Sequence, residues 1–286
     1  MSENRADLFR TESCSFHDFV SIVKERVDTK RSWVFRGQKR QACETNGKWK
    51  WLLETSFERA CNRFGVTGAE ERVKLEDKMM REFQRRLHIY TSDIPDNSSP
   101  DEWLSLMQHY GAPTRLLDFT YSPYVAAYFA FECAEPETDV AVWAVDATWC
   151  TERLEETNKD LAKRYSLYGE NREGTEFKAI FMASQPHRLV LSVNPFRRNE
   201  RLAYQKGVFL CPGDVTVGFM NNLSGFAGKN SQNYVIQYAI KGHDRDSVLR
   251  ELESMNINRT TLFPGLDGFA QSFSVGIITD KSLSTR

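Results

Sequence analysis

The order of two kinds of apolar periodicity along the chain limits its fold most strongly. Apolar residues recur at helical spacing over residues 15–27, 69–90 and 99–111, all in the first half of the 286 residues. After residue 138 they alternate or run together as in strands, at 139–146, 187–193, 207–213 and 233–240. Helices followed by strands, rather than regular alternation, predict an α+β fold with a helical N-terminal half packed on a mostly antiparallel sheet.

Length and composition indicate a globular chain with no visible division. No repeat, low-complexity tract or long Pro/Gly/Ser linker interrupts the sequence, so we expect a single domain with a sizeable core. The formal net charge of −1 gives no global electrostatic reason for binding nucleic acid or an anionic membrane. A local contact with nucleic acid stays open.

The chain also lacks the patterns of metal sites and of membrane segments. Its six cysteines form no C-x-x-C pair, and its five histidines are scattered, so no cluster has metal-ligand spacing. The N-terminus is polar, and no run approaches the roughly 20 apolar residues that cross a bilayer. We therefore expect a reduced, cytoplasmic protein with no metal and no membrane association.

Residues 108–120, QHYGAPTRLLDFT, place charged side chains inside a segment that otherwise resembles core. His109, Arg115 and Asp118 stand beside leucines and a phenylalanine, and Thr120 ends the segment. Buried charge costs free energy unless it is paired or used. Two interpretations stay open: these residues line a polar cleft, or Arg115 and Asp118 form a structural ion pair.

A second polar group, Arg36, Gly37 and Gln38 in VFRGQ, stands at the end of the short strand predicted at SWVFRG, which Gly37 ends. Glycine at this position allows close approach of another backbone or of a ligand. The planar guanidinium of Arg36 suits an anion such as pyrophosphate. The alternative is a structural pair between Arg36 and a carboxylate such as Asp118.

A third polar group precedes the strand predicted at 207–213. Gln205 could hydrogen-bond a sugar hydroxyl or a base edge, or merely close a turn. Familiar phosphate loops, the H-E-x-x-H zinc motif and the G-x-S-x-G nucleophile motif are absent from the sequence.

Four segments of the chain share the pattern of a known family: WVFRGQ (33–38), WLSLMQHYGAPTRLLDFTYSPYVAAYFA (103–130), RLAYQKGVF (201–209) and INRTTLFPGLDGFA (257–270). Together they resemble the FRG domain, which is named for its aromatic-Arg-Gly motif. The resemblance implies one domain over residues 15–275, with flexible termini at 1–14 and 276–286. It implies little about activity, because FRG domains are largely uncharacterised.

The layout is also similar, more weakly, to ADP-ribosyltransferases of the Arg-Ser-Glu type, which implies a related fold and NAD as a candidate substrate. The sequence departs from that family where Gln205 and Gly207 stand in place of acids. Cleavage of the nicotinamide–ribose bond passes through an oxocarbenium-like state that a carboxylate stabilises and an amide does not. Either Glu200 or Asp118 substitutes, or the cleft binds without this reaction.

Two functional hypotheses follow, and whether the chain is an enzyme stays open. The first is a nucleotide-directed enzyme acting on NAD in a toxin or phage-defence role. The second is a non-catalytic module that recognises a nucleotide, a nucleic-acid end or a peptide. The candidate catalytic residues are Arg36, His109 and Asp118, and the candidate ligand-binding residues are Arg36, Gln38, Arg115, Thr120 and Gln205.

Overall fold

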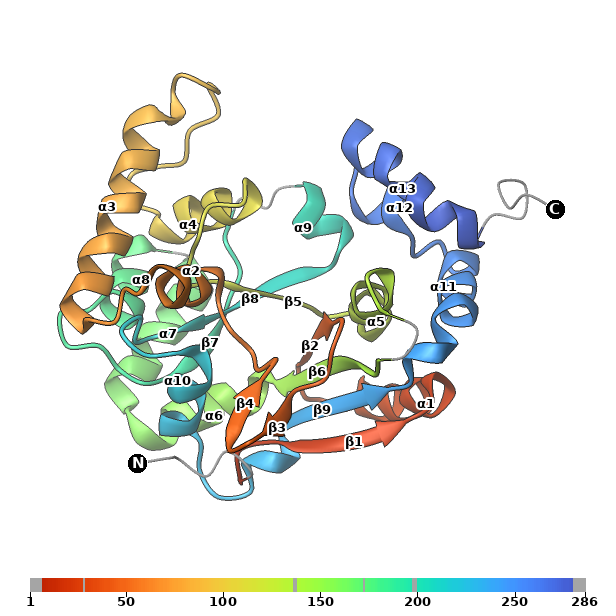
Figure 1. The fold of residues 1–286 in the computed structure, drawn as a ribbon. Coiled ribbons are helices and arrows are strands. Elements are labelled where there is room, and N and C mark those ends of the chain that lie inside the picture. Colours follow the sequence, from red (N-terminus) through yellow and green to blue (C-terminus); the bar gives the residue numbers. More distant parts are fainter. Residues whose placement is uncertain (1–6, 28, 136–137, 172, 197–199, 280–286) are drawn as a thin grey trace.

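The computed structural model describes residues 7–279 except 28, 136–137, 172 and 197–199. Its centre is a seven-stranded sheet (Figure 1). In spatial order the strands are β1 (Arg10–Cys14), β9 (Val235–Ile240), β6 (Val140–Asp146), β2 (Trp33–Gln38), β5 (Leu117–Thr120), β8 (Gly207–Pro212) and β7 (Val190–Val193). All neighbours pair antiparallel except β1 and β9, which run parallel. The predicted α+β class and mostly antiparallel sheet are confirmed.

Helices cover both faces of this sheet. One face packs against α1 (Phe16–Val27), α5 (Pro123–Glu132) and α11 (Arg245–Ser254), which contribute buried residues to one apolar cluster. The second cluster lies on the other face, under helices that Figure 1 shows at the left. These are α4 (Pro100–His109), α6 (Ala147–Thr157), α7 (Lys159–Asn171), α8 (Gly174–Phe181) and α10 (Phe219–Phe226). Strands buried on both faces explain the continuous apolar runs of β6, β8 and β9.

The remaining elements lie around this core. A small hairpin pairs β3 (Cys43–Thr45) with β4 (Lys48–Lys50). The other helices are α2 (Ser56–Phe64), α3 (Ala69–Leu87), α9 (Glu200–Tyr204), α12 (Arg259–Leu262) and α13 (Leu266–Thr279). Within the described residues, none of the helices has both the length and the apolarity that crossing a membrane requires.

Regular secondary structure extends into both segments that were expected to be termini. Strand β1 lies inside the segment 1–14, yet its backbone pairs with β9 from Arg10 opposite Ile236 to Cys14 opposite Ile240. This segment is therefore a strand of the sheet, because its backbone groups hydrogen-bond to β9. It lies at one edge, since β1 is first in the strand order. Helix α13 likewise continues past residue 276. Residues 1–6 and 280–286 lie outside the described part.

Two local features hold the elements that border the candidate site. The hydroxyl of Ser122 accepts a hydrogen bond from the backbone N–H of Val125, and Pro123 takes the first position of α5. Gly37 of β2 faces the same helix so closely that a Cβ there would lie 1.9 Å from the backbone oxygen of Ala126. Glycine is therefore required for the packing of β2 on α5, so of the two partners that the sequence left open, a backbone or a ligand, the structure has a backbone.

Candidate functional site

A cleft opens where β2 and β5 separate. These strands pair through Phe35 opposite Thr120. Beyond this pair a cavity of about 230 Å³ is lined by Arg36 and Gly37 of β2 and by Phe119 and Asp118 of β5. We call this cavity the inner chamber. Its wall is completed by Phe129 of α5, Arg201 of α9 and Gln205.

Two further cavities continue the cleft. A middle chamber of about 60 Å³ lies beside the end of α4 and shares Asp118, Arg201 and Gln205 with the inner chamber. An outer chamber of about 580 Å³ is lined by residues from the end of α4, from α9 and from the α12–α13 pair. Figure 1 shows α9 between α4 and the α12–α13 pair. His109 lines the middle and outer chambers, and Arg201 lines all three. Asp118 shares the inner chamber with Arg36 and the middle chamber with His109, whereas Arg36 and His109 line no chamber in common.

Arg36 and Asp118 contact each other through the backbone. The Nη1 of Arg36 donates to the backbone oxygen of Asp118 at 2.6 Å and lies 3.9 Å from its carboxylate Oδ2. The Nε of Arg36 is buried and has no hydrogen-bond partner among the described residues. Burial lowers the pKa of Arg36, with Asp118 opposing this and Arg59 adding to it. The guanidinium thus keeps unused donor capacity at the cleft.

Gln108 of α4 holds the Asp118 carboxylate in place. Its Oε1 accepts hydrogen bonds from the hydroxyls of Thr114 at 2.6 Å and Ser56 at 3.3 Å. Since these donors fix the orientation of the amide, the Nε2 group donates to Oδ2 of Asp118 at 2.8 Å. The Asp118 side chain remains 54% exposed. Gln108 was not among the candidate residues, although it lies beside His109 in the segment 108–120.

His109 presents a neutral imidazole to the cleft. Its Nδ1 is buried without a partner in the described part of the chain, and its ring packs edge-to-face on Tyr110 at 4.9 Å between centroids. Burial lowers the pKa of His109, and the nearby Arg201 lowers it further. A neutral imidazole can donate or accept one hydrogen bond at each nitrogen, depending on its tautomer.

Arg201 is the functional candidate that sequence reasoning did not select. Its pKa is lowered by burial and by Arg259, against the opposing charges of Asp118 and Glu132. Its guanidinium lies 4.5 Å from the ring centroid of Phe263, and no hydrogen bond or ion pair to another described residue holds it. An underused, half-buried cation of this kind favours an anionic ligand. The sequence indicated Arg201 only through its position at the start of RLAYQKGVF, one of the four segments that resemble the FRG domain.

Thr120 and Gln205 line the inner chamber, but their polar groups are largely used within the protein. The hydroxyl of Thr120 donates to the backbone oxygen of Gln205 at 2.6 Å and accepts from the N–H of Ser122 at 3.0 Å. The Nε2 of Gln205 donates to the backbone oxygen of Leu262 at 3.0 Å. These bonds fix the chamber wall and leave the Gln205 side chain at its surface.

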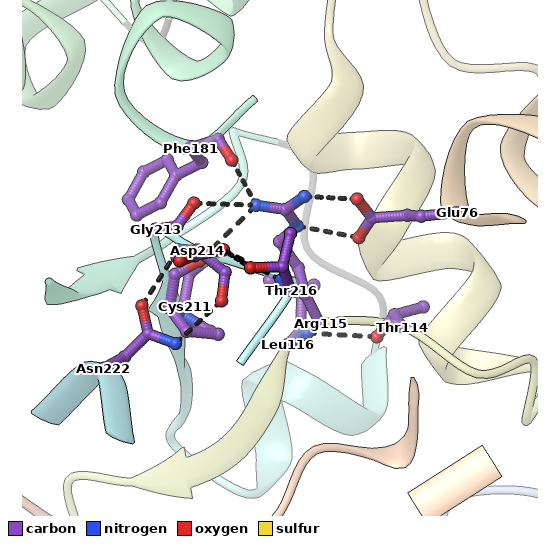
Figure 2. A network of polar contacts seen from close by, with 11 residues as sticks. Glu76, Thr114, Arg115, Leu116, Phe181, Cys211, Gly213, Asp214, Thr216 and Asn222 are labelled. Carbon is purple, nitrogen blue, oxygen red and sulfur yellow. Dashed lines mark hydrogen bonds and ion pairs between the residues drawn. The ribbon is translucent and has the colours of Figure 1, made fainter. Parts of the chain in front are cut away.

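Arg115 lies elsewhere, which corrects its expected role in ligand binding. It is 3% exposed and lines none of the three chambers. Figure 2 shows its guanidinium between the carboxylate of Glu76 on α3 and backbone oxygens, among them those of Phe181 and Gly213. Burial opposes the charge, but Glu76 outweighs it and raises the pKa of Arg115. Arg115 therefore pairs with Glu76 rather than Asp118, and it ties α3, β5 and α8 together.

Gln38 is also not placed to contact a ligand. Its Oε1 accepts a hydrogen bond from the indole Nε1 of Trp143 at 2.9 Å, and it borders none of the chambers. Gln38 therefore satisfies a buried donor on β6, because an indole N–H in the core needs an acceptor.

The carboxylates of the cleft are few. Asp118 is the acid that lines the inner chamber, and Glu200 and Asp267 line the outer one. Glu132 lies behind Arg259 and accepts hydrogen bonds from it and from Tyr128. Within the described residues, three or more His, Cys, Asp or Glu side chains do not come together as a metal site.

Comparison with known proteins places part of this cleft in a family. The FRG domain model matches residues 31–139, which include Arg36, His109 and Asp118 but not Arg201. No curated protein and no solved structure matches the chain, so the likeness to ADP-ribosyltransferases gains no support from these comparisons. The match agrees with the resemblance of the aromatic-Arg-Gly strand and of the 103–130 segment, and the chain therefore contains an FRG domain.

Proposed function

We propose that the cleft binds a nucleotide and that Arg36 and Arg201 hold its phosphate. The observation that carries this proposal is Arg201, a half-buried guanidinium on the wall common to all three chambers that no described carboxylate pairs with. A buried arginine without a counter-ion costs free energy, which a bound anion recovers. The unpartnered Nε of Arg36 supplies a second donor on the inner side.

The remaining walls suit the uncharged part of a nucleotide. The inner chamber carries the aromatic residues Phe35, Phe119 and Phe129 beside the polar Gln205. An apolar pocket with a few convergent polar groups is the usual form of a small-molecule site. In this proposal Gln205 and His109 contact sugar hydroxyls or base edges. Thr120 supports the wall of the inner chamber. We place this binding in the cytoplasm.

Asp118 supports a catalytic version of the same proposal, in which the bound nucleotide is NAD. Its carboxylate borders the inner and middle chambers and is held by Gln108 at 2.8 Å. A carboxylate fixed in this way can stabilise the oxocarbenium-like state that forms as the nicotinamide–ribose bond breaks. Consumption of NAD depletes a cofactor of the cell, which is consistent with a toxin or phage-defence role. The non-catalytic version of the proposal lacks this step.

One assay tests both versions. The protein is incubated with a panel of nucleotides, and binding is followed by calorimetry while breakdown is followed by chromatography. Binding without breakdown supports the recognition module, whereas release of nicotinamide from NAD that Asp118→Asn abolishes supports the enzyme. Absence of binding by every nucleotide contradicts both.

A further inference from the structure

The position of Arg201 within the cleft bears on what kind of nucleotide fits. The cleft continues past Arg201 into the outer chamber of about 580 Å³, larger than the inner chamber of about 230 Å³, so a ligand whose phosphate lies at Arg201 has space on both sides. We infer that the ligand carries a nucleoside on each side of a bridging pyrophosphate. Its inner phosphate contacts Arg36 and Arg201, its outer phosphate contacts Arg201 and Arg259, and the outer chamber receives the second nucleoside. This inference rests on the proposed function and specifies its ligand class.

Two neighbouring cations favour a pyrophosphate over a single phosphodiester. The guanidinium groups of Arg201 and Arg259 each lie 4.5 Å from the ring centroid of Phe263, so one aromatic side chain holds both at the junction. Arg259 also contacts Glu132 and Gln271, and its Nε is buried with no hydrogen-bond partner in the described chain. Arg259 is already paired with the carboxylate of Glu132, so Arg201 carries the unbalanced charge, and two adjacent phosphates can contact both guanidinium groups.

The rim of the outer chamber suits a nucleoside better than a further phosphate. Glu200 and Asp267 line it and are both exposed, so a γ-phosphate entering the chamber would meet two carboxylates. The same carboxylates can accept hydrogen bonds from ribose hydroxyls or from the amino group of a base. The geometry thus disfavours a nucleoside triphosphate that extends outward from Arg201.

Tyr110 supplies a surface on which the second base can stack. It borders the outer chamber at the end of α4, and its side chain is 66% exposed. Alanine substitution of a stacking aromatic residue typically weakens binding about fivefold to 150-fold for each base. Tyr204 is a matched control, because it is 59% exposed on α9 yet lines none of the three chambers.

The experiment compares three probes by calorimetry at one salt concentration: ADP, diadenosine diphosphate, and the 3′,5′-linked diadenosine monophosphate. We expect diadenosine diphosphate to bind about tenfold more tightly than ADP, by the stacking contribution of the second base. Tyr110→Ala should remove this gain and leave ADP binding unchanged, whereas Tyr204→Ala should change neither.

Each other outcome has a distinct meaning. Equal affinity for ADP and diadenosine diphosphate, or a gain that survives Tyr110→Ala, overturns this inference and leaves the proposed function intact. Tightest binding by the 3′,5′-linked probe overturns the pyrophosphate assignment and indicates a nucleic-acid strand. Binding of none of the three overturns the proposed function together with the inference.

Discussion

Arg36 is bound to the backbone of Asp118 more closely than to its carboxylate. The guanidinium donates to the backbone oxygen at 2.6 Å, while the carboxylate Oδ2 lies 3.9 Å away and is held at 2.8 Å by Gln108. The backbone oxygen fixes the direction of the cation without neutralising its charge. Both charged groups therefore stay available on the same wall of the cleft, which a direct bidentate ion pair would have prevented.

Replacing Arg36 should affect binding much more than stability. Arg36→Ala removes one hydrogen bond to the Asp118 backbone, which is worth about 1 kcal/mol of unfolding free energy. The lost phosphate contact should weaken nucleotide binding about tenfold to a hundredfold, since bonds to charged groups contribute about 1.5–3 kcal/mol. Urea denaturation and calorimetry on the same samples measure the two effects. A large loss of stability with unchanged affinity would show that Arg36 is purely structural.

The hydrogen-bond direction at Gln108 predicts a pH-dependent variant. Gln108→Glu keeps the acceptor for Thr114 and Ser56, but it can donate to Asp118 only when the new carboxyl is protonated. Because a neighbouring carboxylate and partial burial favour the proton in the folded state, stability should match the wild type in acid and fall as pH rises. Gln108→Leu should be destabilised at both pH 4.5 and pH 7.5. Equal loss for both variants at every pH would contradict the assigned orientation of the amide.

His109 should titrate below its usual pKa of 6.5, because burial and Arg201 both disfavour the imidazolium. Removing the charge in Arg201→Ala should raise the pKa of His109, as measured by NMR, whereas Arg250→Ala on the exposed face of α11 should not change it. A depressed folded-state pKa means that the unfolded chain binds the proton more readily. The stability associated with His109 is therefore complete above pH 6.5 and is lost as pH falls through the folded-state pKa. A pKa of His109 that is insensitive to Arg201→Ala would place the two side chains farther apart.

The Arg115–Glu76 pair should be a stability determinant. Arg115→Ala leaves a buried carboxylate and backbone oxygens without their partner, which costs about 3–5 kcal/mol. Arg164→Ala breaks the more exposed 3.0 Å pair with Glu176 and should cost less than about 1 kcal/mol. Urea denaturation of the two variants makes the comparison. Similar small losses would show that the buried network in Figure 2 is not formed in solution.

Local sequence patterns predicted the elements that border the cleft. Gly37 indicated a close approach at the end of β2, and the structure shows that its neighbour is the backbone of α5. A glycine can be recognised from the sequence as permitting such an approach, although its partner cannot. The α+β class followed in the same way from the order of helical and strand periodicities.

The division of polar residues between cleft and core could not be predicted in this way. Arg115 and Asp118 are three residues apart, yet one lies on a buried carboxylate of α3 and the other in the cleft. That outcome depends on Glu76, which is distant in sequence. Arg201 was missed because its short helix gives no periodic signal, and β1 because its partner β9 lies at the other end of the chain.

The most direct test of the central claim is the nucleotide affinity of Arg201→Ala. The side chain lines all three chambers, and its one close contact among the described residues is with the ring of Phe263, without a hydrogen bond or ion pair, so its loss should not unfold the protein. We predict at least about a tenfold loss of affinity for the best nucleotide of the panel, with the melting temperature of the free protein nearly unchanged. Unchanged affinity in a folded Arg201→Ala variant would contradict the assignment of the phosphate to this cleft.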